Sequence, residues 1–233
     1  KIVNQASCHK ILAAFVVGDF SFTSTLVNEC RRRGVSLFFL NQNFRSYASF
    51  SPMASGNYLL RAAQYKMESA RELEIAKNLV KNKIQNQSRL LKSAGDNYGG
   101  EQAEAILASV SSAKNINELL GFEGNFSKVF FKNYFKEIGW FRRMPRVKPD
   151  IPNFLLDMGY TMLFNFTDAL LLLFGFDTYK GCYHQLFFQR KSLTCDIVEP
   201  FRCIIDRQLL KSYHLKQIDE KDFSIEQERY DLT

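Results

Sequence analysis

Cysteine and histidine are scarce in this sequence, and their spacing argues against two common kinds of site. The five cysteines are an odd number and include no Cys-x-x-Cys pair. This pattern disfavours a disulfide framework and a zinc site, and it is typical of reduced thiols in a cytoplasmic protein. The chain has only three histidines, so a site that needs an imidazole can use few positions.

The sequence also shows no pattern typical of a targeting or membrane-spanning segment. No positively charged leader with an apolar run and a small-residue cleavage site is visible. The most apolar stretch, residues 160–176, is shorter than the ~20 residues that span a membrane, and it contains Asn165 and Asp168. We therefore expect a buried helix there and no membrane association. Because the chain runs from Lys1 straight into an apolar segment, we expect the first strands of its amino-terminal domain to lie outside it.

The composition is that of a globular protein with a polyanionic partner. Hydrophobic residues make up 46% and charged residues 24%, which separates the chain from disordered sequences. At 233 residues it can bury a core in one large domain or two small ones. Lysine and arginine exceed the acids by 31 to 24, and the resulting net charge of +7 favours a polyanion as partner.

The first fifty residues have the features of a β-rich domain. Residues 11–18 and 35–41 are short apolar runs with β-branched and aromatic side chains, and they predict strands. Residues 23–34 begin with Thr and Ser, place Leu and Val on one side and end at Gly34, which predicts a short helix. The three arginines before Gly34 complement the negative end of that helix, which explains them without a ligand.

From Tyr58 onward, apolar residues recur every three or four positions, which predicts amphipathic helices. We expect one long helix from Tyr58 to the glycine-rich residues 93–100, and a second that ends at Gly121. A third helix follows from Asn125, and a basic loop with three prolines, residues 142–152, leads into the apolar helix.

This change of period predicts an α+β fold in two parts. A small β-rich amino-terminal domain is expected over residues 1–52, and a larger all-helical catalytic domain over residues 53–233. The expected hinge lies near residues 50–57. No internal repeat and no low-complexity segment is visible.

One stretch combines a histidine with two acids, namely His184, Asp196 and Glu199. If the segment from Asp196 is helical, the two acids share one face, because residues three apart are neighbours on a helix. The alternative is structural: an Asp-x-x-Glu pattern before Pro200 suits a helix start, with Asp196 as N-cap and Glu199 closing a capping box. Both interpretations can hold, since a rigid helix start is a good place to fix a ligand.

A third acid, Glu123, lies at the expected entry of an apolar helix. The helix dipole stabilises a carboxylate there, so this position also has a structural explanation. Taken together, carboxylates and an imidazole suit Mg²⁺ or Mn²⁺ in phosphodiester chemistry, because hard oxygen ligands leave positions open for water and phosphate oxygens. The histidine shifts the preference toward Mn²⁺.

Four motifs, taken in order, resemble a known family. They are GFEGNFSKVFFKNYF at 121–135, RRMPRVKPDIPNFLLDMGYTMLFNF at 142–166, GFDTYKGCYH at 175–184 and SLTCDIVEPFRCIID at 192–206. Together they resemble the spacer-acquisition integrase of CRISPR systems, the Cas-one family. Residues 1–41 also look like that family's amino-terminal β domain after its opening strands, so the resemblance covers nearly the whole chain.

The resemblance implies a divalent-metal site, Mg²⁺ or Mn²⁺, whose ligands match Glu123, His184 and Glu199, with Asp196 supporting activity beside the metal. It implies an integrase and endonuclease in which the 3′-hydroxyl of a short DNA attacks a phosphodiester at a CRISPR repeat, the adaptation step of antiviral defence. It also implies double-stranded DNA as partner, a homodimer paired through the β-rich domains and, commonly, a complex with the small protein Cas-two.

Six basic residues flank the expected site, namely Arg142, Arg143, Arg146, Lys148, Arg190 and Lys191. Each can be explained as a solvated surface charge, but their clustering beside a phosphate-cutting site favours contacts to the DNA backbone. Two other function classes remain open. One is a general metal-dependent DNA nuclease of repair or mobile-element type. The other is a non-catalytic DNA-binding scaffold, which the intact set of acids and histidine argues against.

Overall fold

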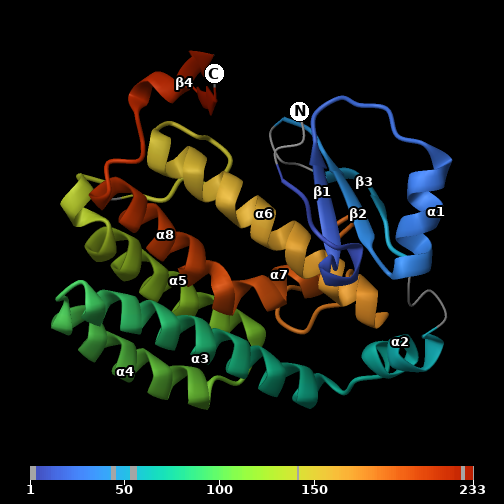
Figure 1. Cartoon of the computed structure of the whole chain (residues 1–233). Coiled ribbons are helices and arrows are strands. Elements are labelled where there is room, and N and C mark those ends of the chain that lie inside the picture. Colours follow the sequence, from blue (N-terminus) through green and yellow to red (C-terminus); the bar gives the residue numbers. More distant parts are fainter. Residues whose placement is uncertain (1–3, 43–45, 53–56, 141, 227–228, 233) are drawn as a thin grey trace.

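The computed structural model describes residues 4–42, 46–52, 57–140, 142–226 and 229–232 (Figure 1). It has a mixed fold in which helices predominate, in agreement with the predicted mixture of α and β. The α-helices are α1 (Ser24–Arg33), α2 (Tyr58–Tyr65), α3 (Ser69–Ser93), α4 (Asn97–Ser112), α5 (Ile116–Tyr134), α6 (Ile151–Phe174), α7 (Ser192–Val198) and α8 (Arg202–His214). The strands are β1 (Ala13–Val17), β2 (Ser36–Leu40), β3 (Ser46–Phe50), β4 (Phe223–Glu226) and β5 (Arg229–Leu232). Short 3₁₀ turns are η1 (Cys8–Lys10), η2 (Lys136–Ile138), η3 (Glu199–Phe201) and η4 (Glu220–Asp222).

The amino-terminal region is a three-stranded sheet in the order β1-β2-β3. Strand β1 runs parallel to β2, and α1 makes the crossover between them. The side chain of Thr23 caps α1 by accepting a hydrogen bond from the Leu26 N–H, and Gly34 ends the helix with a φ of +71°. The two strands and the helix predicted for this region are confirmed. Strand β3, antiparallel to β2, was not predicted, because its five residues carry mostly small or polar side chains.

Strand β2 is buried along its whole length and joins the sheet to the helical part. Leu37 and Phe39 pack on the α1 side of the sheet, in a cluster with Cys30. Phe38 and Leu40 face the other way and pack against Ala169 of α6. In Figure 1, α6 runs from the sheet across the helical part, so this one long helix bridges the two regions.

The helical part has its own core, built from α3, α4, α5 and α8 with parts of α6. Its fully buried members include Ile84, Leu91, Leu119, Phe126 and Phe130. Helices α3, α4 and α5 lie side by side at the foot of the molecule in Figure 1. Helices α6 and α8 approach closely at Gly159, where an added Cβ would lie 2.4 Å from Cγ2 of Ile205. The glycine therefore sets how near α8 can come to α6.

Two predicted helix boundaries are wrong, and each has a physical reason. The long helix expected from Tyr58 is divided into α2 and α3, because Gln64 of α2 bonds the 177–180 loop: its Nε2 donates to the carbonyl oxygens of Asp177 and Lys180. The expected boundary between the second and third helices, Gly121 to Asn125, lies inside α5. That helix begins instead after Asn115, whose side chain accepts from the Glu118 N–H while Glu118 accepts from the backbone of Lys114.

The carboxy-terminal region differs from the all-helical prediction. Strands β4 and β5 form an antiparallel hairpin after α8, and the Tyr230 N–H donates to the carbonyl of Lys148 in the basic loop. Part of the expected hinge, residues 53–56, lies outside the described residues. The helix expected over residues 160–176 is confirmed up to Phe174 as part of α6, but it is buried on only part of its surface, since Met162, Phe166 and Phe174 are exposed. No helix within the described residues combines the length and the apolar character of a membrane span.

Candidate active site

The four predicted site residues come from four elements of the fold and form two bonded groups. Glu123 lies on α5, His184 in the loop between α6 and α7, Asp196 on α7 and Glu199 in η3. His184 Nδ1 is 2.7 Å from Asp196 Oδ1. The two glutamates meet through Lys83 of α3, whose Nζ is 2.7 Å from Glu199 Oε2 and also bonds Glu123 Oε1.

Asp196 holds the loop that carries His184. Its side chain is fully buried and accepts backbone N–H bonds from Cys182 at 2.6 Å, Tyr183 at 2.9 Å and His184 at 2.8 Å. The same carboxylate bonds His184 Nδ1 and fixes the ring; when the ring is neutral and its proton lies in this bond, the lone pair is on Nε2. Gly181 permits this arrangement, since a Cβ there would lie 2.6 Å from Asp196 Oδ2.

The structural explanations considered for these acids are wrong. Asp196 is not an N-cap, because α7 begins at Ser192 and Asp196 lies in its second turn. Glu199 therefore closes no capping box; its two oxygens bind Lys83 and Arg202 instead. Glu123 lies in the middle of α5 and not at its entry, so the dipole at the helix start does not account for it.

Opposite charges pair throughout the cluster. Glu199 Oε1 is 2.9 Å from Arg202 Nη2, and Ser127 Oγ donates to Glu123 Oε1 at 2.9 Å. Burial alone would raise the pKa of Glu199, but Lys83 and then Arg202 outweigh it and hold that pKa at about 2. Burial likewise opposes the charge on Lys83, yet Glu199 and Glu123 raise its pKa above the usual value. Glu199 and Lys83 are therefore both charged at neutral pH.

The donor set of Glu123, Glu199 and His184 suits a hard divalent cation. It offers carboxylate oxygens and one imidazole nitrogen, and Asp196 orients that imidazole as a second layer of support. His184 is close enough to Glu199 to lower its pKa. Within the described residues, no three His, Cys, Asp or Glu side chains form a ready metal cluster. The cation between the two glutamates is instead the ammonium of Lys83.

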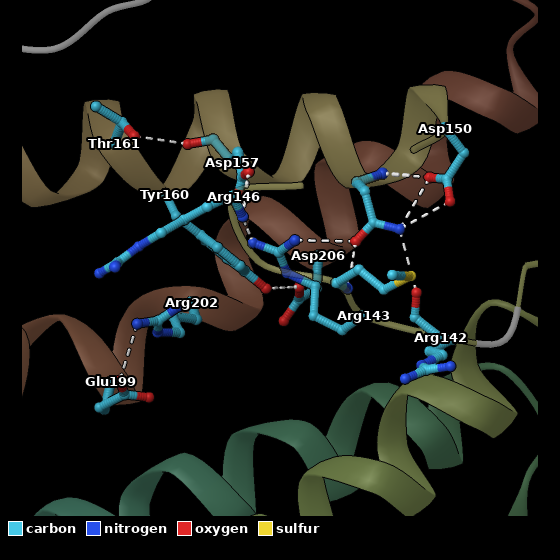
Figure 2. A network of polar contacts seen from close by, with 12 residues as sticks. Arg142, Arg143, Arg146, Asp150, Asp157, Tyr160, Thr161, Glu199, Arg202 and Asp206 are labelled. Atoms are coloured by element: carbon cyan, nitrogen blue, oxygen red, sulfur yellow. Dashed lines mark hydrogen bonds and ion pairs between the residues drawn. The ribbon is translucent and has the colours of Figure 1, made fainter. Parts of the chain in front are cut away.

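A buried polar network supports the cluster from the α6 side (Figure 2). The Arg202 guanidinium lies over the ring of Tyr160, 4.7 Å from its centroid, and the Tyr160 hydroxyl donates to Asp206 Oδ1. Arg143 pairs with Asp157 and donates to Asn153 Oδ1 at 2.9 Å. The network thus runs from Glu199 through Arg202 to the start of α6.

One protein family matches the chain along its whole length. The family model described as CRISPR associated protein Cas1 matches residues 1–233. The chain belongs to this family. It is the Cas-one family that the four motifs resemble, so that resemblance is confirmed.

The relatives of this Cas1-family chain have low sequence identity to it, but the matches cover most of its length. A CRISPR-associated endonuclease Cas1 from Thermodesulfovibrio yellowstonii is 29% identical over 228 residues, which cover 91% of this chain and 72% of the relative. Another, from Thermus thermophilus, is 28% identical and covers 89% of this chain and 64% of the relative. A solved Cas1 protein from Thermotoga maritima matches with a TM-score of 0.80 at 22% identity, over 98% of this chain and 76% of that one. A casposase bound to integration product matches with a TM-score of 0.82 at 22% identity, over 97% of this chain and 68% of that one.

The six basic residues of this Cas1-family chain differ in how freely they could meet DNA. Three are held by acids: Arg143 by Asp157, Lys148 by Asp231 at 3.0 Å, and Lys191 by Asp168 at 2.7 Å. Arg190 folds back onto its own loop and donates to the Gln185 carbonyl. Arg142 and Arg146 are exposed, and within the described part of the chain their guanidinium groups have no partner. These two are the best placed to contact phosphates.

Two members of the cluster escaped prediction. Lys83 and Arg202 were not singled out from the sequence, although Arg202 directly follows the Glu-Pro-Phe of the last motif. A signal for Lys83 does exist, because it shares the buried face of α3 with Val80, Ile84 and Gln87. A lysine in the middle of an apolar stripe indicates a buried anionic partner.

Proposed function

We propose that this chain is a divalent-metal-dependent DNA integrase that inserts short foreign DNA into a CRISPR repeat array, and that it also cleaves DNA. The observation that carries the proposal is that residues of three separate motifs lie near one another: Lys83 joins Glu123 to Glu199, and His184, bonded to Asp196, is close enough to Glu199 to lower its pKa. Membership of the Cas1 family and the structural match to a casposase bound to integration product support integration rather than cleavage alone.

In this proposal Glu123, Glu199 and His184 Nε2 hold one Mg²⁺ or Mn²⁺. When bound, the metal polarises the phosphodiester, lowers the pKa of the attacking 3′-hydroxyl and offsets charge on the leaving oxygen. The chain's own residues prepare this site. Asp196 fixes the imidazole and its loop, and Arg202 holds Glu199 in place from the side of α8. If water replaces the 3′-hydroxyl, the same site hydrolyses DNA.

We propose that the protein acts as a homodimer whose residues 1–52 form a separate pairing domain, on double-stranded prespacer and repeat DNA. A Cas2 partner is proposed as well. A solved Cas6-RT-Cas1–Cas2 complex matches 95% of this chain at 26% identity with a TM-score of 0.78, and this chain covers 26% of that one. A Cas1–DNA complex matches with a TM-score of 0.54 at 13% identity.

The metal ligands are tested by measuring metal binding and strand transfer on Glu199→Gln, Glu123→Gln and His184→Ala. Each variant should lose both together, and double variants should be no worse than single ones, because ligands of one ion fail as a unit. Since Glu199 also neutralises buried cations, the metal-free melting temperature of its variant should fall. The decisive thermal readout is therefore the rise in melting temperature on adding Mn²⁺, which should vanish. Glu101→Gln, at an exposed position on α4, is the matched control.

Asp196→Asn tests the supporting role. The amide still offers one oxygen to the loop but places an N–H where a second acceptor stood. It should weaken Mn²⁺ binding without abolishing it.

The fate of a labelled donor DNA distinguishes an integrase from the alternative function, a general nuclease. An integrase joins the donor's 3′ end to a repeat-bearing target, and a general nuclease only degrades both. Strand transfer at the wild-type rate by Glu199→Gln would refute the site itself.

A further inference from the structure

Lys83 has a position that the proposed reaction does not explain. It is 7% exposed, comes from a helix that supplies no proposed metal ligand, and places its ammonium between the two glutamates proposed to bind metal. Its distance of 2.7 Å from Glu199 Oε2 is that of a direct charge-assisted hydrogen bond. The lysine thus occupies the position between the carboxylates that a divalent ion would share.

The charges of the two glutamates and their two cationic partners balance without a metal. Lys83 and Arg202 carry two positive charges, and Glu123 and Glu199 carry two negative ones. The side chains of Lys83 and Glu199 are only 9% and 8% exposed, so water screens the charges poorly. Like charges a few ångströms apart in such a place repel strongly. A divalent ion added between the two glutamates would face both cations, and the neighbouring carboxylate of Asp196 is already engaged by His184 and three backbone N–H groups.

We propose that Lys83 competes with the divalent ion for Glu123 and Glu199 and, once displaced, binds a phosphate of the DNA, so that metal and DNA bind cooperatively. This inference rests on the proposed metal site. The proposed binding of the displaced Lys83 to a DNA phosphate follows from the chemistry of the substrate. The reacting phosphodiester must bind at the ion. Its negative charge would pair with the ammonium that the ion has displaced from the carboxylates.

The shape of a lysine side chain suits this exchange. Its flexible four-carbon stem lets the ammonium move by a few ångströms without moving α3, and a lysine binds phosphate as a point charge from many directions. Arg202 is less suited to exchange, because its guanidinium is fixed between Glu199 and the Tyr160 ring. The movable cation of the cluster is therefore Lys83.

The test measures Mn²⁺ affinity by calorimetry, with and without a short duplex DNA of random sequence. For the wild-type chain we expect DNA to strengthen Mn²⁺ binding. For Lys83→Met, which keeps the stem but not the charge, we expect Mn²⁺ alone to bind about tenfold or more tightly than to wild type, since a competitor worth over ~1.4 kcal/mol is gone. The enhancement by DNA should shrink in the same variant. In Ca²⁺, the salt dependence of its DNA binding should fall by about one unit of slope.

Two further variants make the result decisive. Lys92→Met, an exposed lysine on the same helix, should behave as wild type. Lys83→Arg keeps the charge and should retain weak Mn²⁺ binding, so it answers the question if Lys83→Met does not fold. Unchanged or weaker Mn²⁺ binding by folded Lys83→Met, or unusually tight binding by Lys83→Arg, would overturn the inference. No Mn²⁺ binding by any variant, wild type included, would instead refute the proposed metal site and this inference with it.

Discussion

Asp206 should make the stability of this protein depend on pH in a way that can be measured without any ligand. Its side chain is fully buried on α8 and accepts a hydrogen bond from the Tyr160 hydroxyl through Oδ1 (Figure 2). Within the described part of the chain, Oδ2 has no hydrogen-bond partner. Burial raises the pKa of Asp206 from 3.8 to about 7, although the Tyr160 hydroxyl and Arg202, with smaller effects from Lys83 and Arg143, act to lower it.

The sign and size of the effect follow from this shift. Below about pH 4 the carboxyl is protonated in the folded and unfolded states alike. Between about pH 4 and 7 the folded state keeps a proton that the unfolded state has lost, so the free energy of unfolding falls as pH rises, by at most about 1.4 kcal/mol per pH unit. Over that interval the loss approaches about 4 kcal/mol, and above about pH 7 it stops growing.

Urea unfolding between pH 5 and 8 checks this. In Asp206→Asn this part of the pH dependence should disappear, and the variant should become more stable relative to wild type as pH rises. Its amide can still accept from Tyr160 and carries no charge to bury. Tyr160→Phe removes a hydroxyl that lowers the pKa, so its loss of stability should extend to higher pH. Asp222→Asn, an exposed change of equal charge, controls for net charge. Equal pH slopes for wild type and Asp206→Asn between pH 5 and 7 would refute the reasoning.

Three other predictions concern the loop, the DNA contacts and the assembly. Gly181→Ala brings a Cβ to 2.6 Å from Asp196 Oδ2 and 2.8 Å from the backbone of Ser192, so melts should show a loss of about 1–3 kcal/mol, and calorimetry should show weaker Mn²⁺ binding. Gly121→Ala on α5, whose Cβ would meet nothing within 4 Å, should instead stabilise by up to about 1 kcal/mol. Changing Arg142 and Arg146 to alanine together should weaken binding to unrelated DNA sequences about equally and reduce its salt slope, whereas a loss limited to one sequence would contradict backbone contact. Light scattering should show a dimer, and a monomer that joins both ends of a donor would count against it.

The parts of the fold that sequence predicted are those where local signals agree with tertiary contacts. Strand β2 is buried on both faces, so its continuous apolar run was sufficient, and Thr23 and Gly34 mark the ends of α1 without help from other residues. The break after α2 depends on Gln64 bonding a loop more than a hundred residues away, which no local pattern contains. The start of α5 was misplaced because Gly121 was taken as a helix end, whereas the structure shows a helix that is capped at Asn115 and runs through Gly121.

The acids and the histidine of the candidate site were predicted from the sequence, but its two cations, Lys83 and Arg202, were not. Acids beside a lone histidine are conspicuous, and their order along the chain matches a known family. Lys83 looks like one more lysine on a charged helix until its place on the buried stripe is counted. Arg143 was chosen for its position in a basic loop; the structure shows its partners Asp157 and Asn153, and its contact with DNA stays a prediction.

The spread of the cluster along the chain has a consequence for the protein while it is being made. Lys83 is 40 residues from Glu123 but 116 from Glu199. During synthesis from the amino end, the first pair can form well before η3 leaves the ribosome. Until α7 also emerges, Asp196 cannot bind the backbone N–H groups around His184, and Lys83 is the cation that balances the charge of Glu123. A nascent chain that ends before α7 therefore carries the salt bridge between Lys83 and Glu123 but lacks Glu199, so the proposed activity would become possible only after residues 184–199 have been translated and folded.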